Sequence, residues 1–327
     1  MGSRSSIPLV SVVIPAYGHA EYILDTLESV FAQTFRDFEV IIVNDGSPDN
    51  TAEVLQPFIK NGLIRYIEQV NSGVSVARNT GVSHSLGKYI AFLDDDDLWP
   101  QEKLQWQVCF LEAHEAVAVG GNAMTLGGDV TLDGSINDGR EAMLNFRQFL
   151  TGSQFHSPGQ VMIRKECLIN LGGLDENIWG ADDLDLWMRL ASLGPFFRLH
   201  LPALQYRIHD SNASNASDRM LLNVDKVLKK HLVGLCEADR RTYCRISYRW
   251  LFEYLGRNLL KAAFVHNDPN LTRHPKRLGI LSLVFRVFFT RVFADPLLGV
   301  TMARACGKHV VDAIKFKLTT SRQFSPN

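Results

Sequence analysis

Four consecutive aspartates, Asp94 to Asp97, are the densest group of potential ligand atoms in this 327-residue sequence, and they follow an apolar segment at 88–93. Carboxylates this close repel one another, and a bound divalent cation would relieve the repulsion. Oxygen ligands of this kind suit Mg²⁺ or Mn²⁺. A calcium loop of the EF-hand type does not fit, because Trp99 and Gln105 stand where that loop needs Gly and Glu. The alternative is an acidic turn that stabilises the start of the next helix.

A second acidic cluster consists of Asp182, Asp183 and Asp185, directly before apolar residues with helical spacing. A carboxylate crowded by other carboxylates has a raised pKa and accepts a proton more readily, which suits a general base. Acids at a helix start also stabilise the helix electrostatically, so simple capping is the alternative. His209 stands in the motif Tyr-Arg-Ile-His. Taken alone, such a histidine is more often an ordinary core or surface residue than a ligand.

Strands and helices alternate along the first hundred residues. The apolar, β-branched segments are short and end in turn residues, whereas the segments between them repeat apolar residues at helical spacing. This alternation predicts an α/β fold with a mostly parallel, Rossmann-like sheet flanked by helices. The predicted strands are 10–14, 38–43, 64–67 and 88–93, and the predicted helices are 23–31, 50–58 and 74–86.

Asp45, in the turn Asn-Asp-Gly-Ser, ends the second predicted strand as Asp94 ends the fourth. Taken alone, such a turn indicates a loop rather than a ligand site. Open α/β sheets bind ligands at the carboxyl edge of their strands, so we expect Asp45, Asp94 and Asp96 to lie at the same edge. No Gly-x-Gly-x-x-Gly follows the first strand and no Gly-x₄-Gly-Lys-Ser/Thr occurs, which removes the main support for a dinucleotide or P-loop site.

The pattern is less regular after the fourth strand. Residues 101–113 and 185–193 predict helices, and 160–163 predicts a strand. The stretch 120–139 is rich in Gly and Asp, which predicts turns and hairpins. Beyond residue 218 the sequence predicts helices with Lys and Arg spaced along them.

Charge is divided unevenly along the chain. Residues 1–218 contain 14 Lys and Arg against 28 Asp and Glu, a net charge of −14, whereas residues 219–327 contain 20 against 7, a net charge of +13. The basic part therefore predicts an anionic partner, which could be membrane headgroups, an acidic glycan or the acidic part of the same chain. The chain carries no recognised nucleic-acid motif, and we expect no nucleic-acid partner.

The segment 278–300 is the most apolar, but Arg286, Arg291 and Asp295 interrupt it. A membrane span needs about 20 uninterrupted apolar residues, so we do not expect one. An amphipathic helix that lies in a membrane interface or packs on its own protein fits the pattern better. The apolar residues expected to share one face of it are Leu281, Val284, Phe285, Phe288, Phe289 and Val292.

The five cysteines are scattered and include no Cys-x-x-Cys pair, which favours a reducing compartment and argues against a structural zinc site. The polar start at residues 1–6 is not followed by an apolar stretch of signal-peptide length. We therefore expect a cytoplasmic protein, with residues 218–327 as the part that would contact the cytoplasmic face of a membrane.

Five motifs stand in order along the chain: Val-Val-Ile-Pro-Ala-Tyr at 12–17, Val-Asn-Asp-Gly-Ser at 43–47, Ala-Arg-Asn-Thr-Gly at 77–81, Phe-Leu-Asp-Asp-Asp-Asp at 92–97 and Ala-Asp-Asp-Leu-Asp-Leu-Trp at 181–187. Together they resemble the family 2 glycosyltransferases, which have the GT-A fold. As an ordered set the motifs are highly specific. The resemblance covers about residues 8–215 and does not include the basic C-terminal third.

The resemblance implies donor-binding roles for one group of residues. In that family the end of the first strand lines the nucleotide pocket, here Pro15 and Tyr17. The Asp after the second strand, Asp45, would hold the base or ribose. Arg78 would lie on the nucleotide side. Asp94, with Asp95 beside it, would face the ribose.

The same resemblance implies a metal site and a base. Asp96 would be the direct metal ligand, and His209 an additional ligand to the metal or diphosphate. Asp183 would be the catalytic base, next to Asp182, where family members usually carry Glu-Asp. Asp185 is close enough to compete for that role. Another departure is Gly18, which follows Tyr17 where the family frequently has Asn.

These roles imply an inverting transfer of a sugar from a nucleotide-diphospho-sugar, with a UDP-sugar as the expected donor and Mn²⁺ or Mg²⁺ as the cation. The acceptor would be a hydroxyl of a glycan or lipid-linked glycan, in cell-surface polysaccharide synthesis. Residues 1–105 would form the donor-binding half of a GT-A domain and 106–217 its acceptor-binding and catalytic half. Residues 218–327 would be a basic helical extension.

Two other functions compete with this one. A non-catalytic module could bind a nucleotide-sugar or glycan and dock to a partner or membrane through the basic tail, but such a binder needs no base in the cluster at 182–185. A nucleotidyltransferase would need a Gly-rich loop with Arg or Lys after the first strand, and residues 15–22 contain neither cation.

Overall fold

The computed structural model describes residues 7–128, 131–212, 216–259, 277–292, 295 and 297–305. The chain forms two compact units. The first comprises 1–149 and 153–212, and the second 150–152 and 213–327. All residues assigned a role in the candidate site belong to the first unit.

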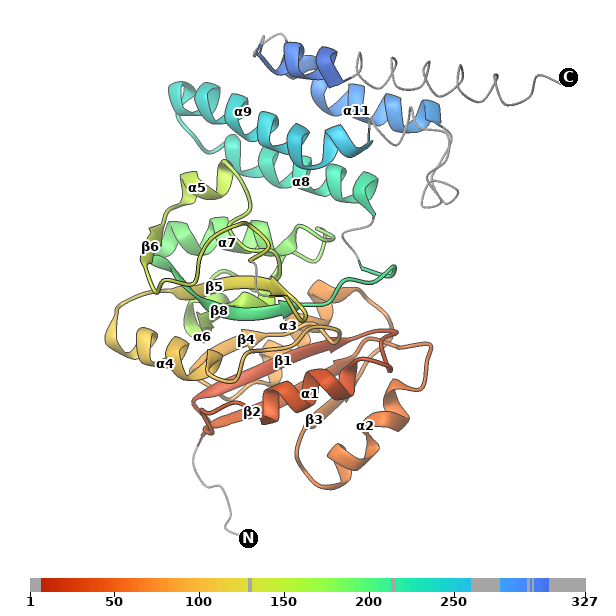
Figure 1. Ribbon diagram of the computed structural model, residues 1–327, viewed down its shortest axis with the longest axis vertical. Helices are drawn as coiled ribbons and strands as arrows, with labels where there is room; N and C mark the ends of the chain where they lie inside the picture. Colours follow the sequence, from red (N-terminus) through yellow and green to blue (C-terminus); the bar gives the residue numbers. More distant parts are fainter. Residues whose placement is uncertain are drawn as a thin grey trace, which may run out of the picture. The chain divides into compact units, whose positions relative to one another are not determined.

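The first unit is built on one eight-stranded sheet with the strand order β3-β2-β1-β4-β7-β5-β8-β6 (Figure 1). The first four strands in this order are parallel, as are β5 and β8, whereas β7 and β6 run antiparallel to their neighbours. This confirms the expected α/β class with a mostly parallel sheet. The strands are β1 (Val10–Ala16), β2 (Phe38–Asn44), β3 (Arg65–Glu68), β4 (Tyr89–Phe92), β5 (Ala118–Thr125), β6 (Glu141–Leu144), β7 (Val161–Arg164) and β8 (Phe196–Tyr206).

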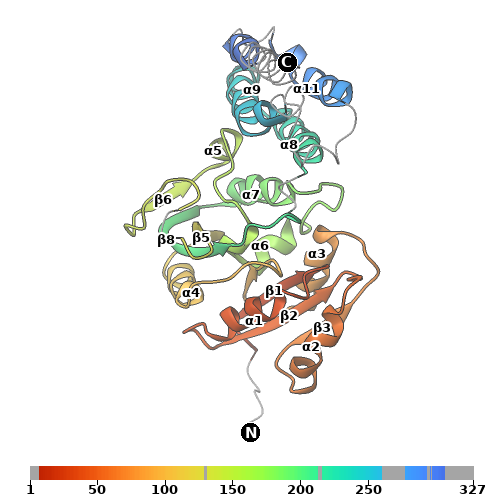
Figure 2. The ribbon, with the colours of Figure 1, turned by 45° about the vertical axis from the view of Figure 1, so that its right-hand side comes forward.

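Helices cover both faces of this sheet, and α1 and α3 lie on opposite sides of β1 (Figure 2). Alternate residues of β1 face opposite ways, so Val12 and Ile14 pack in the same core cluster as α1, whereas Val13 lies beneath α3. The helices of this unit are α1 (Ile23–Phe31), α2 (Thr51–Lys60), α3 (Val74–His84), α4 (Lys103–Ala113), α5 (Phe146–Leu150), η1 (Pro158–Gln160), α6 (Lys165–Asn170) and α7 (Asp182–Leu193).

The expectation of turns and hairpins at 120–139 is wrong at its start, because β5 runs through residues 118–125 as a largely buried strand. Gly120 and Gly121 are there for packing rather than for turns. A Cβ on Gly120 would stand 2.3 Å from the Phe155 ring. The long strand β8, which the sequence did not predict, lies beside β5 and leads directly to His209.

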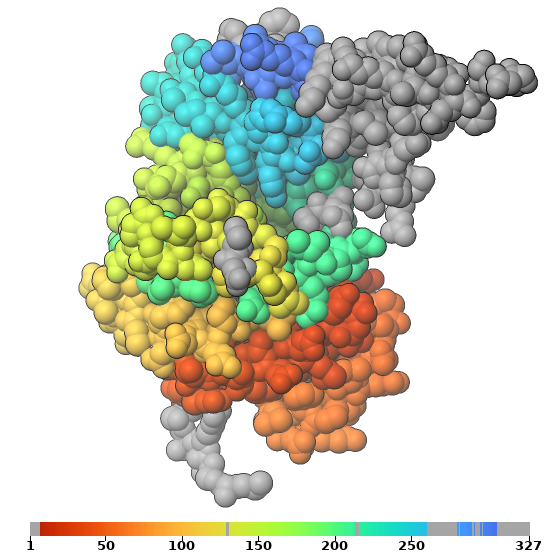
Figure 3. All heavy atoms as spheres, in the orientation of Figure 1, coloured from red at the N-terminus to blue at the C-terminus, as the bar shows by residue number. Residues whose placement is uncertain are grey.

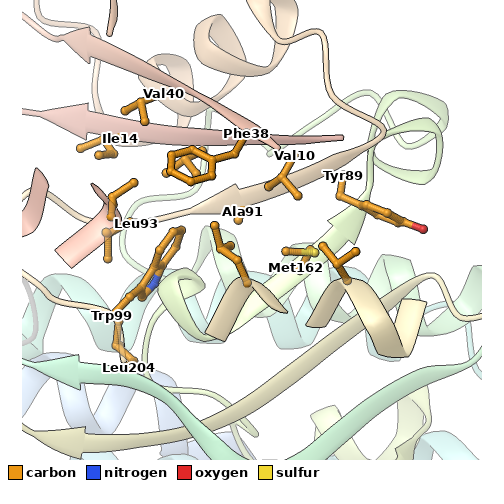
Figure 4. Packing of buried hydrophobic residues seen from close by; sticks show 14 of the residues in the cluster. Val10, Ile14, Phe38, Val40, Tyr89, Ala91, Leu93, Trp99, Met162 and Leu204 are labelled. Atoms are coloured by element: carbon orange, nitrogen blue, oxygen red, sulfur yellow. The ribbon is translucent and has the colours of Figure 1, made fainter. Parts of the chain in front are cut away.

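The aspartate turn, Asp94–Asp97, is anchored by the tryptophan that follows it. Trp99 is 3% exposed and points into the core beside Leu93 and Leu204 (Figure 4). Its indole nitrogen donates to the carbonyl of Gly159 at 2.9 Å. The neighbouring Leu98 forms an antiparallel bridge with Gln205 of β8. The aspartate turn is therefore held between the sheet core and the end of β8.

The second unit is helical where the structure describes it. Its apolar helix α11 does not keep the single apolar face expected from the sequence, because Val284 and Phe288 are buried whereas Phe285 and Phe289 are about half exposed. The side chains of Leu281 and Val292 lie outside the described residues. Contact of residues 218–327 with an anionic surface stays a prediction. The elements are α8 (Ser217–Leu232), α9 (Glu237–Leu251), η3 (Phe252–Gly256) and α11 (Arg277–Val292).

Arg291, one of the charged residues that interrupt the apolar segment 278–300, packs within the helical unit. Its guanidinium lies 4.5 Å from the centre of the Tyr248 ring, so it stacks inside the helical unit. Tyr248 in turn donates to Asp225 at 2.6 Å. Part of the positive charge of this region therefore serves its own packing.

No helix among the described residues is both long enough and apolar enough to cross a bilayer.

Replacing Gly81 with Ala tests the close approach of α3 to β1. Ala is favoured over Gly in a helix by about 1 kcal/mol, but the added Cβ would stand 2.3 Å from Cγ1 of the buried, stiff Val13. Overpacking costs about 1–3 kcal/mol. An approach of 2.3 Å to a stiff side chain belongs in the upper part of this range, so the cost outweighs the propensity gain. We expect Gly81→Ala to lower the free energy of unfolding by about 1–2 kcal/mol in urea titration, while Ser83→Ala, exposed on the same helix, stays near wild type. A Gly81→Ala protein as stable as the wild type would contradict the close packing.

Candidate active site

The main chain of the aspartate turn is held from two sides. From α1, Thr26 Oγ1 donates to the carbonyls of Asp95 at 3.1 Å and Asp97 at 2.9 Å. From the end of β8, Arg207 donates its Nε to the carbonyl of Asp96 and its backbone N–H to Asp97 Oδ1, both at 2.9 Å. These bonds hold the main chain of the turn from Asp95 to Asp97 in place.

Arg78 of α3 joins the aspartate turn to the second acidic cluster. One terminal nitrogen lies 2.6 Å from Asp94 Oδ1, and the other lies 2.8 Å from Asp182 Oδ2. Arg78 is 4% exposed. Burial by itself would lower the pKa of Arg78, but the charges of Asp94 and Asp182 raise it above its usual value. The guanidinium therefore stays charged and ties two segments that are far apart in the sequence.

Asp183 follows Asp182 at the start of α7, and its surroundings raise its pKa as a general base requires. Burial raises the pKa of Asp183 to about 7, and the negative charge of Asp182 adds to this effect. Asp185, the competing candidate, is fully buried, and its carboxylate pairs with Arg189 at 2.8 Å. Arg189 also donates to the carbonyls of Leu171 and Gly173, so Asp185 serves the anchoring of α7.

Two histidines, His19 and His209, contact carboxylates of the aspartate turn that Arg78 does not bind. His19, in the loop after β1, contacts Asp95 Oδ1 through Nδ1 at 2.8 Å. His209, just after β8, contacts Asp96 Oδ2 through Nε2 at 3.0 Å. The His209 ring also lies 5.0 Å from that of Tyr22, and Figure 3 shows the end of β8 (green) lying against the segment after β1 (red).

The charges of this group shift the acid–base properties of its members. The hydrogen bond to Asp95 raises the pKa of His19 to about 9, although burial acts in the opposite direction. Burial raises the pKa of Asp96 to about 6, and the charges of Asp94 and Asp95 add to it. Burial and the neighbouring carboxylates also raise the pKa of Asp97 well above its usual value. The carboxylates of the aspartate turn repel one another, and a bound divalent cation would reduce this repulsion.

The donor set fits such a cation. His19, Asp96 and His209 each offer one ligand atom, and the three atoms all lie within 4.8 Å of one another. A carboxylate with imidazole nitrogens is a usual environment for divalent first-row metals. The sequence assigned Asp96 and His209 to the metal, and the structure brings these two side chains into contact.

Asp45 is placed differently from the other carboxylates. Its Oδ1 accepts from Gln69 Nε2 at 2.7 Å and from the N–H of Ser72 at 2.9 Å, and its Oδ2 accepts from the N–H of Gly73 at 2.8 Å. Asp45 is 3% exposed. Its carboxylate therefore shapes the loop that leads into α3 and positions Arg78. A direct contact of Asp45 with the donor stays a prediction.

Pro15 and Tyr17 lie at the same edge of the sheet. Pro15 is buried in β1 two residues beyond the last pairing of β1 with β4, at Val13, so its missing N–H interrupts no pairing on that side. Tyr17 is half exposed, and its backbone N–H donates to Asp95 Oδ2 at 2.8 Å. Asp95 therefore holds the loop after β1 through both Tyr17 and His19.

Three residues of the site were not assigned a role from the sequence. His19 follows Tyr17 by two positions at the carboxyl edge of the sheet, and that position is the signal that could have revealed it. Arg207 stands in the same Tyr-Arg-Ile-His motif as His209, but its contacts with Asp96 and Asp97 depend on β8. Ser157 donates to Asp94 Oδ2 at 3.1 Å, and no sequence pattern points to it.

Comparisons with known proteins agree with this architecture. The family described as Glycosyl transferase family 2 matches residues 11–172. The UDP-Glc:alpha-D-GlcNAc-diphosphoundecaprenol beta-1,3-glucosyltransferase WfaP of Escherichia coli is 28% identical over 262 residues, which cover 80% of this chain and 98% of WfaP. Uncharacterized glycosyltransferases from three Rickettsia species are 31 to 32% identical, and the chain spans only 30 to 31% of their length.

Solved structures share the fold. Residues 1–349 of TarS from S. aureus, in complex with UDP-GlcNAc, have a TM-score of 0.68 at 18% identity, covering 95% of this chain and 92% of that one. The mannosyltransferase PcManGT from Pyrobaculum calidifontis, in complex with GDP-Man and Mn²⁺, has a TM-score of 0.58 at 19% identity, covering 95% and 88%. The class of the protein is therefore a glycosyltransferase domain of GT-A type. Through residues 11–172 the chain belongs to glycosyltransferase family 2.

Removing Arg78 should expose its electrostatic role. Without the guanidinium, Asp94 and Asp182 face each other with no counter-charge, and breaking a buried pair costs about 3–5 kcal/mol. We expect Arg78→Ala to lower the free energy of unfolding by this amount at about pH 8, and by less at about pH 5, because the folded variant can then protonate a carboxylate. Urea titrations at both pH values measure the difference, with the exposed Arg36→Ala as the control. An equal loss at both pH values would show that packing rather than charge is responsible.

Proposed function

We propose that this chain is a divalent-cation-dependent, inverting glycosyltransferase that transfers a sugar from a nucleotide-diphospho-sugar to a hydroxyl of a glycan or lipid-linked glycan. The observation that carries the proposal is the double ion pair of Arg78, which joins Asp94 of the aspartate turn to Asp182. It brings the expected donor side next to Asp183, a carboxylate with a pKa near neutrality. A donor site and a base held together in this way are what a direct displacement requires.

The cation would be held by Asp96 and His209, whose donor atoms are 3.0 Å apart. When bound, it supplies a Lewis acid that stabilises negative charge on the leaving nucleoside diphosphate. Thr26 and Arg207 keep the main chain of this turn in place through its carbonyl groups. Mn²⁺ and Mg²⁺ are both compatible with the proposed function.

Asp183 would act as the general base on the acceptor hydroxyl. A sugar hydroxyl has a pKa far above 7, so its proton leaves only as the bond to the anomeric carbon forms. The carboxylate must be ionised to take that proton, and Asp183 reaches this state as the pH rises through about 7. Asp182, whose carboxylate pairs with Arg78 at 2.8 Å, would position Asp183 rather than act as the base itself.

The donor is proposed to be a UDP-sugar, bound along the carboxyl edge of the sheet by Pro15, Tyr17 and Asp94. Asp95 would act there by holding the loop after β1 in place. Asp45 would act there by shaping the loop before α3. WfaP, by its name, uses UDP-glucose and a diphosphoundecaprenol-linked sugar, and this similarity supports a UDP donor and a lipid-linked acceptor. A place in cell-surface polysaccharide synthesis, on the cytoplasmic side, is part of the same proposal.

Replacing Asp183 with Asn tests the base. We expect kcat to fall by about 10²–10⁴ with unchanged UDP affinity, because the amide keeps the shape but cannot accept the proton. In the wild type, kcat should rise with pH through about 7 and then level off. Measurements are nucleotide release over a panel of donors and acceptors, and calorimetry with UDP and Mn²⁺. Asp37→Asn, an exposed carboxylate at the opposite edge of the sheet, is the control.

If Asp183→Asn kept its turnover, a residue other than Asp183 would have to be the general base. Binding of UDP by the wild type with no turnover on any donor would favour the non-catalytic binding module instead.

Replacing Asp96 with Ala tests the cation. We expect the Mn²⁺-dependent part of UDP binding to weaken by about tenfold or more, since a ligand to the ion is lost. Calorimetric titration of UDP at several Mn²⁺ concentrations, and in EDTA, separates this part from metal-independent binding. An unchanged Mn²⁺ dependence would remove Asp96 from the metal site. Wild-type UDP binding that is the same in EDTA would contradict the cation dependence as a whole.

A further inference from the structure

We infer that His19 is a third protein ligand of the divalent cation, beside Asp96 and His209, and that this donor set makes the site select Mn²⁺ over Mg²⁺. The inference rests on the proposed function, which itself needs only Asp96 and His209 to hold a cation. None of the five sequence motifs includes His19. The new element is a second imidazole and its effect on the choice of metal.

The spacing of the three side chains fits one ion. Two atoms bound at about 2.1 Å to the same ion are about 3.0 Å apart at right angles and about 4.2 Å apart on opposite sides. The 3.0 Å between His209 Nε2 and Asp96 Oδ2 matches a right-angle pair. A ring nitrogen of His19 lies within 4.8 Å of both other ligand atoms, and His19 Nδ1 lies 3.7 Å from Asp96 Oδ2. These separations are within about 0.6 Å of the range that one ion requires.

Asp95 gives His19 the orientation that a ligand needs. It accepts from the backbone N–H of Tyr17 through Oδ2 and contacts His19 Nδ1 through Oδ1, both at 2.8 Å, and it is 6% exposed. A metal-bound imidazole keeps a proton on one nitrogen only. With that proton on Nδ1, shared with Asp95, the cation takes the place of the proton on Nε2. A carboxylate in this position is the usual outer partner of a metal-bound histidine.

His209 shows the same arrangement from the other side of the site. Its Nδ1 contacts Ser211 Oγ at 2.6 Å, and its Nε2 faces Asp96. The rings of His19 and His209 are 5.2 Å apart and nearly perpendicular. Both histidines thus have one nitrogen engaged by a polar group outside the set.

Two imidazole nitrogens change which cation the site prefers. Mg²⁺ prefers oxygen ligands and gives up its water reluctantly, whereas Mn²⁺ and the later first-row metals accept imidazole readily. A site with one imidazole discriminates less between the two ions. Removing His19 should therefore weaken Mn²⁺ binding more than Mg²⁺ binding.

Pulsed electron paramagnetic resonance of Mn²⁺ bound to the full chain with UDP counts the coordinated imidazole nitrogens directly. We expect two in the wild type and one in His19→Ala. Titration should show the Mn²⁺ dissociation constant of His19→Ala raised by about tenfold or more, with a smaller change for Mg²⁺ in competition. His84→Ala, an exposed histidine at the far end of α3, should behave as the wild type.

The outcomes separate this inference from the proposed function. A single imidazole nitrogen in the wild type, with Mn²⁺ and UDP still bound, would overturn His19 as a ligand and leave the glycosyltransferase function in place. No binding of Mn²⁺ with UDP would contradict the proposed function, and His19 as a ligand with it. The wild-type spectrum decides the ligand count even if His19→Ala does not fold.

Discussion

A buried guanidinium between two carboxylates is the interaction on which the rest of the site depends. Arg78 comes from α3, Asp94 from the end of β4 and Asp182 from the start of α7, and they meet at 2.6 and 2.8 Å. Each of these charges would cost several kcal/mol to remove from water without a partner. The pairing therefore allows few alternative arrangements, and it sets the distance between the aspartate turn and the proposed base. The loop held by Asp45 completes this support because it leads into the helix that carries Arg78.

Burial also shifts the pKa values of the carboxylates that are not paired with Arg78. Asp183 and Asp96 have pKa values raised to about 7 and about 6, since low exposure and neighbouring carboxylates disfavour their charged forms. For Asp183 this places the ionised and protonated forms in balance near neutral pH, where a general base is most effective. For Asp96 it means that a proton competes with a cation for the carboxylate. One physical cause, desolvated negative charge, thus underlies both the proposed base and the proposed metal site.

The parts of the fold with regular local patterns were predictable from the sequence. The first four strands and the helices between them were found within a few residues, because alternating strands and helices have distinct apolar periods. The prediction failed at 120–139, where glycines of β5 make room for Phe155 and resemble turn residues in a linear reading. It also missed β8, whose neighbours β5 and β6 precede it by many residues. The periodicity of a strand does not reveal its partners.

The sequence by itself determined the types of the reactive side chains and their positions in the secondary structure. They are carboxylates at strand ends and at a helix start, in an order that matches one enzyme family. It could do so because turns and helix starts depend on residues that are neighbours in the chain. Only the tertiary structure decided the partners of most of these carboxylates, giving Asp45 to a loop, Asp182 to Arg78 and Asp95 to His19. Ion pairs and hydrogen bonds act over a few ångströms in space, so residues separated by more than a hundred positions, such as Arg78 and Asp182, become partners only when the sheet brings their segments together.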